Sequence, residues 1–334
     1  VCFVELSKMH IMMLRNTKGL RRSASGGFTL IEILLVIVII LMLAGVGSAR
    51  RTQVRSASAE QPIRDADEPV PISASVLDSI AACPARWFLE REAGGVVRSH
   101  QSANLGQLVH ALAERVADGS AEPDIDTLMV EVDQVWDRLD FRTPWSKTRE
   151  HKRVRAALER FLVWHERNPR RLLATEARFA TVVTMDDGAQ VRINGYADRV
   201  EIDGESRVVV VDLKTGRSKP SGPQVKGHVQ LALYQYAVDA GALDRPAEGL
   251  TELTSGGAEL IQLGLEDGSD EVTRQPQEPH AADGPERTEL RTRIADAAHL
   301  LRTEVFPAVA GEQCRDCGFV ALCPVRSPGS VVER

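Results

Sequence analysis

Four consecutive valines, Val208 to Val211, run directly into the charged segment Asp212, Leu213 and Lys214. A run of β-branched residues predicts a strand with both faces buried, because successive side chains enter opposite sides of a sheet. Asp212 and Lys214 are two positions apart and therefore project from the same face. We expect a rigid central strand that ends in a pair of opposite charges.

Regular alternation of apolar and polar residues surrounds this segment. It predicts strands over 175–185, 189–202 and 206–215, which are joined by turns at "DDG" and "IDGES". Helical patterns precede them over 73–91, 105–116 and 124–168, and further helices are expected over 228–241 and 287–304. A fourth strand is expected over 257–265, and the Pro-, Gly- and acid-rich segment 266–286 predicts a loop. This order predicts a mixed α/β core in which helices flank a central sheet.

The charge of the chain gives no single indication of its partner. Its 334 residues carry a formal net charge of −6, which does not indicate a general nucleic-acid coat, although a local groove could still be basic. Residues 142–171 contain ten Lys and Arg against three Glu. This basic segment is either a solvated helical face or a surface that contacts phosphates, and the sequence leaves both open.

The N-terminal part has a different composition. Residues 28–47 are apolar apart from Glu32, and about twenty such residues can span a bilayer. With the basic leader and the Gly27–Phe28 junction, this stretch resembles a type IV prepilin signal, which implies cleavage after Gly27 and a helix that anchors the protein or packs into a filament. Residues 48–71 are polar and proline-punctuated, which predicts a linker. We expect one domain over 72–326 and a tail over 327–334.

The predicted sheet suggests how the charged pair could work. Asp198, one strand earlier, could lie beside Asp212, and two neighbouring carboxylates repel unless a cation lies between them. A hard divalent cation with oxygen ligands fits such a site, and Lys214 could stabilise the charge of a phosphate transition state or orient the attacking water. The alternative is an ordinary salt bridge at the end of a strand.

Four motifs occur in order along the chain: "LGQLVHALAE", "GYADRVE", "VVVVDLKTG" and "QLALYQYA". Together they resemble the nuclease domain of the RecB family, within the PD-(D/E)XK superfamily, over roughly residues 72–326. The resemblance implies a restriction-endonuclease-like core in which His110, Asp198 and Asp212 bind Mg²⁺ or Mn²⁺. It also implies that the carbonyl of Leu213 adds a ligand and that Lys214 is catalytic.

The same resemblance assigns roles to the helix that follows. Gln230 and Tyr234 match its motif and lie four residues apart, on one helical face; they would contact the DNA backbone or the reaction site. His110, Asp198, Gln230 and Tyr234 could each also be ordinary structural residues. Glu176, in "EARF", is interpreted as structural, with an accessory acid as the alternative.

Three cysteines cluster near the C-terminus, Cys314, Cys317 and Cys323, and Cys83 lies far upstream. Four thiolates suffice for one metal site, and a zinc ion is one candidate. The pattern resembles the iron–sulfur subset of RecB-like nucleases, which implies a [4Fe–4S] cluster that joins the first helix to the end of the domain. Such a clamp would close a very long loop.

We therefore expect a metal-dependent deoxyribonuclease, working as an exonuclease on single-stranded DNA ends during double-strand-break repair. The sequence has no G-x4-G-K-[ST] segment, so a helicase partner would supply the motor. The alternatives are a stand-alone nuclease resembling those of CRISPR adaptation and a pilin-like envelope protein without catalysis. The expected location is the cytoplasm; a membrane anchor through residues 28–47 is the alternative.

Overall fold

The valine-rich segment forms strand β4 (Val208–Lys214), whose side chains alternate between two hydrophobic cores. Val208 and Val210 enter one core, whereas Val209 and Val211 enter the core on the opposite face of the sheet. The predicted strand with two buried faces is therefore confirmed.

The structure is a computed structural model that describes residues 62–65, 67–95, 101–139, 141, 143–245, 248–266 and 268–325. The described residues belong to one unit, Gln61–Arg334. The prepilin-like segment 28–47, most of the expected linker and the expected tail 327–334 lie outside them. Within the described ranges, no helix is both long and apolar enough to cross a membrane.

The described elements follow one another as a short strand, five helices, three strands, two helices, two strands and a last helix. In chain order they are β1 (Val70–Ile72), α2 (Ala74–Ala82), α3 (Pro84–Arg91), α4 (Gln101–Ala117), α5 (Ile125–Trp136), α6 (Pro144–Arg167), β2 (Arg171–Thr184), β3 (Gln190–Ile202), β4, α7 (Gly222–Lys226), α8 (Val229–Asp239), β5 (Ser255–Gln262), β6 (Thr273–Gln277) and α9 (Pro285–Thr303). Two short 3-10 turns, η2 (Glu312–Cys314) and η3 (Val320–Leu322), follow α9.

The sheet has the order β1-β3-β4-β5-β6, and β2 pairs with the other edge of β3. Its β1–β3 and β4–β5 pairs are parallel and the remaining pairs are antiparallel, so the expected mixed sheet is confirmed. On one edge of β3, residues 191–193 pair with β1 and residues 199–202 pair with β4. Residues 194–198 have no strand partner on this edge, which creates a fork between β3 and β4.

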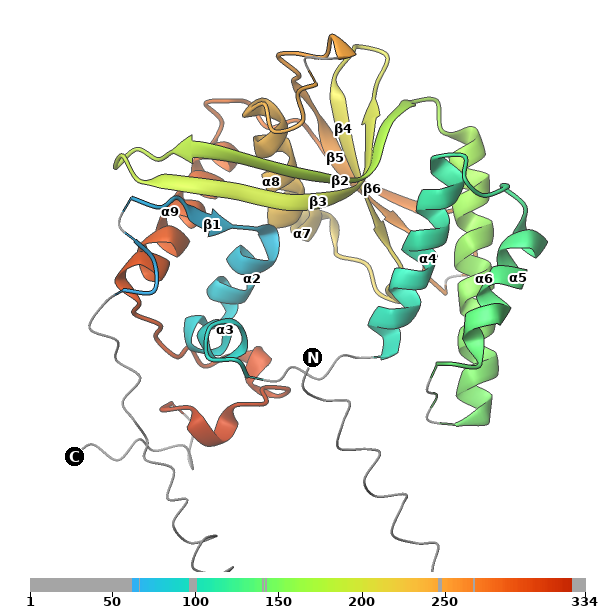
Figure 1. Ribbon diagram of the computed structural model, residues 1–334, viewed down its shortest axis with the longest axis horizontal. Coiled ribbons are helices and arrows are strands. Elements are labelled where there is room, and N and C mark those ends of the chain that lie inside the picture. Colours follow the sequence, from blue (N-terminus) through green and yellow to red (C-terminus); the bar gives the residue numbers. More distant parts are fainter. Residues whose placement is uncertain are drawn as a thin grey trace, which may run out of the picture. The chain divides into compact units, whose positions relative to one another are not determined.

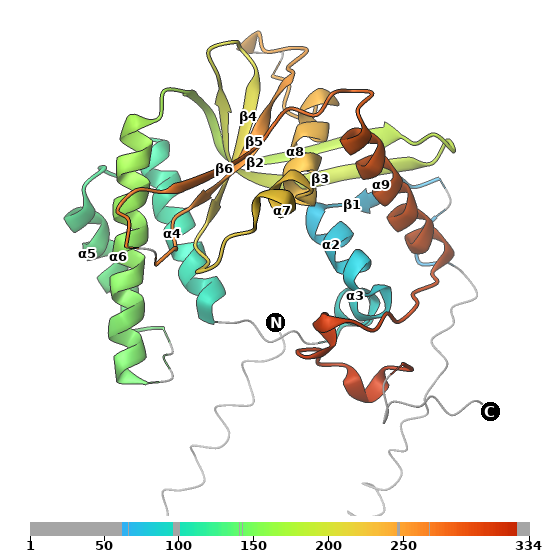
Figure 2. The ribbon, with the colours of Figure 1, turned by 180° about the vertical axis from the view of Figure 1, so that it is seen from behind.

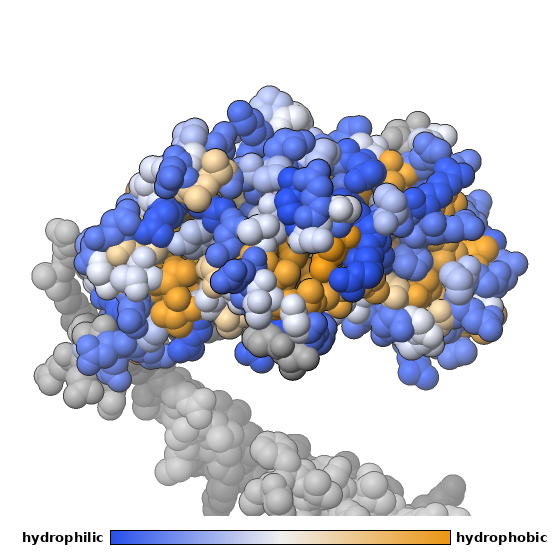
Figure 3. Space-filling model, turned by 90° about the horizontal axis from the view of Figure 1, so that it is seen from above, coloured by the Kyte–Doolittle hydropathy of each residue, from blue (hydrophilic) through white to orange (hydrophobic). Residues whose placement is uncertain are grey.

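Helices cover both faces of the sheet (Figures 1 and 2). Helices α2, α8 and α9 pack on one face and share a core with β1, β2 and β3, whereas α4, α5 and α6 pack on the other. Seen from above, the surface is mostly hydrophilic, with hydrophobic residues in separate groups (Figure 3). This arrangement leaves the fork between two helical layers.

Three predicted elements differ from the structure in detail. The expected helix over 124–168 is two helices, because Thr143 caps α6 through a capping box and Pro144 starts it. The first helix is broken between α2 and α3 at Cys83, before Pro84. The expected loop over 266–286 contains strand β6; its Pro276 is tolerated because β6 is an edge strand.

The basic segment 142–171 largely folds into α6, where much of its charge is paired within the protein. Arg153 pairs with Glu266, Lys147 lies 2.7 Å from Asp137, and Arg160 donates to the carbonyl of Leu263. These internal partners favour the solvated helical face over the phosphate-contacting surface.

Candidate active site at the strand fork

The fork presents the end of β4 to α4 and α8. Asp212 is 2% exposed, and its carboxylate Oδ2 lies 2.6 Å from the ammonium of Lys214. The valines that precede them are packed on both faces, so the backbone that carries this pair is held firmly. The β3–β4 ladder ends at the pair Arg199 and Val211, and the same register places Asp212 opposite Asp198.

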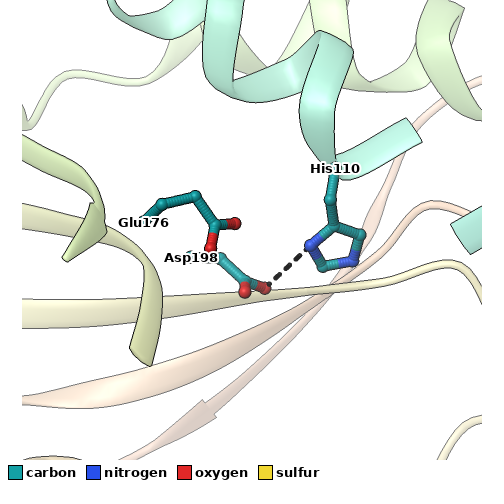
Figure 4. Close-up of side chains that lie close together, drawn as sticks. All are labelled: His110, Glu176 and Asp198. Atoms are coloured by element: carbon teal, nitrogen blue, oxygen red, sulfur yellow. Dashed lines mark ion pairs between the residues drawn. The ribbon is translucent and has the colours of Figure 1, made fainter. Parts of the chain in front are cut away.

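A cluster of three potential metal ligands lies at the same fork (Figure 4). His110 from α4, Glu176 from β2 and Asp198 from β3 each offer one ligand atom, and these atoms lie within 4.8 Å of one another. His110 Nδ1 is 3.4 Å from Asp198 Oδ2. The structure thus brings together two of the predicted ligands, His110 and Asp198, and adds Glu176.

The sequence pattern favours a structural role for Glu176, but the structure places it in the ligand cluster. The register of β2 and β3 explains this position. The ladder pairs Thr175 with Arg199 and Ala177 with Ala197, so Glu176 faces Asp198 across the two strands. Its backbone φ is +42°, a left-handed value uncommon for a residue with a side chain. Glu176 and Asp198 are equally far along the chain from Asp187 in the turn, a symmetry that could have identified Glu176 in the sequence.

Asp198 also substitutes for missing strand pairing. The N–H of Leu213 donates to Asp198 Oδ2 at 2.7 Å, so the side chain of β3 binds the backbone of β4 where the two strands separate. This contact fixes Leu213 directly beside the metal-ligand cluster. A ligand role for the Leu213 carbonyl stays a prediction.

Gln230 and Tyr234, on successive turns of α8, connect Lys214 to β3. Lys214 donates to Gln230 Oε1 at 3.1 Å, and Gln230 Nε2 donates to the Tyr234 hydroxyl at 2.8 Å. The Tyr234 hydroxyl donates to the carbonyl of Tyr196, at 2.9 Å, and lies 3.4 Å from Asp212 Oδ1. The carbonyl of Tyr196 is on the edge of β3 that lacks a strand partner. These contacts orient Lys214 and Asp212 relative to β3.

The electrostatics of the fork indicate an excess of negative charge. Burial and the charge of Asp198 raise the pKa of Asp212 to about 6, although Lys214 opposes the shift. Burial, again with Asp198, raises the pKa of Glu176. Burial lowers the pKa of His110, but its hydrogen bond to Asp198 and the nearby carboxylates outweigh this effect and raise it.

Such a site fits a divalent cation on chemical grounds. The donors are one imidazole nitrogen and carboxylate oxygens, a set that suits Mg²⁺ less fully than Mn²⁺ but admits both. Carboxylates whose pKa is raised by mutual repulsion are stabilised in their charged form by a positive ion between them. The residues present therefore fit the expected metal.

The four cysteines come from two distant segments that contact each other. The N–H of Val309 donates to Cys83 Sγ at 3.4 Å, and Gln313 donates to the carbonyl of Ala82 at 2.7 Å. The ring of Phe319, between Cys317 and Cys323, packs so closely on Gly95 that a Cβ there would lie 2.6 Å from it. The C-terminal segment therefore contacts the α2–α3 junction just before Cys314 and the chain after α3 between Cys317 and Cys323.

No three of these cysteine sulfur atoms form a compact group in the part of the chain that the structure describes. A tetrahedral ion with Zn–S bonds near 2.3 Å would hold its sulfurs about 4 Å apart. Among the described residues, only His110, Glu176 and Asp198 form a group of three ligand atoms within 4.8 Å, and no cysteine trio does.

Comparison with known proteins identifies the class of protein that this fold and fork define. The PD-(D/E)XK nuclease superfamily matches residues 71–324, which include every residue of the fork. The chain belongs to this superfamily, and the membership supports a metal-dependent nuclease that hydrolyses phosphodiester bonds. The resemblance drawn from the sequence motifs is confirmed at the level of the superfamily.

The N-terminal resemblance is confirmed as well. The prokaryotic N-terminal methylation motif matches residues 22–48, outside the described residues.

The crystal structure of SSO0001 is similar at 16% sequence identity and a TM-score of 0.39, covering 88% of this chain and 97% of SSO0001. No curated protein matches the chain significantly.

Proposed function

We propose that this protein is a metal-dependent deoxyribonuclease whose active site is the fork between β3 and β4. The observation that carries the proposal is the juxtaposition of the Asp212–Lys214 pair with the cluster of His110, Glu176 and Asp198. A buried acid and a lysine on a rigid strand end, beside a cluster of metal ligands, are the groups that phosphodiester hydrolysis requires.

Each residue has a distinct task in this proposal. His110, Asp198, Asp212 and the Leu213 carbonyl hold Mg²⁺ or Mn²⁺, with Glu176 as an additional ligand. A cation held there supplies Lewis-acid stabilisation of the charge that develops on the scissile phosphate.

Lys214 stabilises the same developing charge or orients the attacking water. Gln230 holds its ammonium at 3.1 Å, while Tyr234 fixes Gln230 from the next turn of α8. We assign Gln230 and Tyr234 to positioning Lys214 and Asp212.

We further propose that Cys83, Cys314, Cys317 and Cys323 bind a [4Fe–4S] cluster that joins the α2–α3 junction to the C-terminal segment. The contacts of Val309 and Gln313 with this junction support a shared site. Zinc is the alternative. Analysis of the bound metal and the absorption spectrum would distinguish it from an iron–sulfur cluster.

The cellular role follows from the RecB-family resemblance. We propose an exonuclease that degrades single-stranded DNA ends in double-strand-break processing, with a helicase as partner and the cytoplasm as its location. The prepilin-like motif favours a second candidate, an envelope protein anchored through residues 28–47. Cleavage of the chain after Gly27 in cells would support that candidate.

The test is cleavage of labelled single-stranded DNA by the anaerobically purified full chain, with Mg²⁺ or Mn²⁺ and with EDTA. We expect metal-dependent cleavage by the wild type and none by Asp212→Asn. Asp137→Asn is the matched control, because Asp137 is an exposed acid on the surface. Folded wild-type protein that cleaves no DNA with either metal would contradict the proposal.

The cluster has a separate readout in the same preparation. We expect a broad visible absorption band and bound iron in the wild type, and loss of both in Cys317→Ser. A colourless wild type that contains zinc would replace the iron–sulfur assignment, whatever its nuclease activity.

A further inference from the structure

One face of the β2–β3 ribbon is covered by α4 only at Glu176 and Asp198, and no other described element buries the rest of it. Glu176 and Asp198 lie on this face, and every second residue beyond them on each strand shares it. The successive cross-strand pairs are Arg178 with Tyr196, Ala180 with Asn194, Val182 with Arg192, and Thr184 with Gln190. All of these side chains except Asn194 are exposed. In Figure 1 the ribbon extends away from α4, so this open face continues outward from the metal-ligand cluster.

The opposite face of the ribbon is occupied, which fixes the orientation of the open one. Ala177 and Phe179 are buried toward α8, where the Phe179 ring contacts Tyr234 at a centroid distance of 5.9 Å. Gly195, opposite Phe179, has no room for a side chain, since a Cβ would lie 2.7 Å from that ring. The ribbon is therefore held against the helices by one face and presents the other to solvent.

The charge of the open face is positive and uncompensated. The guanidinium groups of Arg178 and Arg192 have no ion pair or hydrogen bond with any described residue, although most arginines of α6 are paired. Beyond Glu176 and Asp198 the face carries no acid. Unpaired guanidinium groups beside a phosphodiester-cleaving site suit phosphate oxygens.

Tyr196 adds an aromatic ring opposite Arg178, between Arg192 and the cluster. It is 59% exposed although its backbone carbonyl is bound by the buried Tyr234 hydroxyl, so a fixed strand presents a solvated ring. It is two positions from Asp198 in the chain, a distance of about 7 Å along the strand. An exposed ring at this spacing can stack on a base next to the scissile phosphate.

We propose that the open face of the β2–β3 ribbon binds single-stranded DNA on one side of the scissile phosphate, with Tyr196 stacking on a base and Arg178 and Arg192 contacting phosphates. The proposal rests on the nuclease function proposed above. Arg192 is six residues from Asp198, about 20 Å along the strand, so the surface accommodates several nucleotides. A single strand is favoured over a duplex because the bases of a duplex are already stacked on one another.

The experiment measures binding without cleavage, so that it is independent of catalysis. The probe is a fluorescent oligothymidylate, bound to the full chain in EDTA and followed by anisotropy over a series of salt concentrations. Tyr196→Ala should weaken binding by about 5- to 100-fold, the range found for loss of one base stack, whereas Tyr196→Phe should bind like the wild type. Arg192→Ala and Arg178→Ala should each lower the slope of log K against log salt by about 0.7.

Arg138→Ala is the matched control, because Arg138 is an exposed arginine without a described ion pair and follows α5, which packs on α6. Its loss should leave affinity and salt slope unchanged. Equal weakening by Arg138→Ala and Arg192→Ala would show that binding follows total charge and would overturn the proposal, as would unchanged affinity in Tyr196→Ala. If the wild-type protein binds DNA through the ribbon but never cleaves it, only the nuclease function is contradicted. If the wild-type protein cleaves DNA while all ribbon variants bind it normally, only the proposed binding surface is contradicted.

Discussion

Glu176 faces Asp198 across the β2–β3 ladder, and His110 from α4 completes a cluster whose ligand atoms lie within 4.8 Å of one another. The two acids are neighbours because one hairpin turn sets the register of both strands. The position of the ligand cluster depends on the ribbon, whereas the position of Lys214 depends on β4. The fork joins the two parts.

Replacing Glu176 with Gln should weaken the metal site without removing its other ligands. Loss of one carboxylate from the cluster should raise the Mn²⁺ concentration needed for half-maximal cleavage by about 10- to 100-fold. Calorimetric titration of Mn²⁺ into protein without DNA should show the same shift. Glu205→Gln, at an exposed acid in the β3–β4 turn, should leave both unchanged; unchanged metal affinity in Glu176→Gln would mean that Glu176 is structural.

Replacing Tyr234 with Phe should slow the chemical step while leaving the packing of the ring in place. The variant loses the hydroxyl that binds Gln230 and the Tyr196 carbonyl, so Lys214 is less well positioned. We expect kcat to fall by about fivefold to tenfold, corresponding to a hydrogen bond of roughly 1 kcal/mol, with little change in KM. An unchanged kcat would show that the contacts from Tyr234 do not reach the reaction.

A buried ion network on the other half of β3 should dominate the stability of the domain. Glu201 is fully buried and pairs with Arg199 and Arg170. Glu201→Gln should lower the free energy of unfolding by about 3–5 kcal/mol, because it leaves buried guanidinium charge without its partner. Urea unfolding would measure this loss of stability. The control is Glu205→Gln, at an exposed acid, which should change the free energy of unfolding by less than about 0.5 kcal/mol.

The stability of the protein should also depend on His165. Its Nδ1 lies 3.2 Å from Arg199 Nη1, and burial, with the charge of Arg199, lowers its pKa. The unfolded chain then binds a proton more readily than the folded one, so the contribution of this group is present above pH ~6.5 and is lost as the pH falls.

Urea unfolding between neutral and acidic pH, compared for wild type and His165→Gln, isolates this contribution. The wild type should lose more stability on acidification than the variant does, whatever the other titrating groups contribute. Parallel stability curves for the two proteins would contradict the assignment.

The sequence by itself determined the sheet and the chemistry at its centre. The valine run predicted a doubly buried strand because alternation along a strand is a local property of the chain, and the spacing of Asp212 and Lys214 placed both on one face. Helix and strand types were predicted by the same local periodicities. The ends of elements were less well predicted, since Thr143, Cys83 and the edge strand β6 act through capping and pairing rather than periodicity.

Only the tertiary structure decided which side chains meet. Glu176 joined His110 because α4 packs over the ribbon, and Tyr196 became an exposed ring because no described helix covers its part of that face. Much of the basic charge of α6 found partners on neighbouring elements that its own sequence does not reveal. Periodicity fixes the face on which a residue lies, but contacts between distant segments arise from packing and register, which no local pattern encodes.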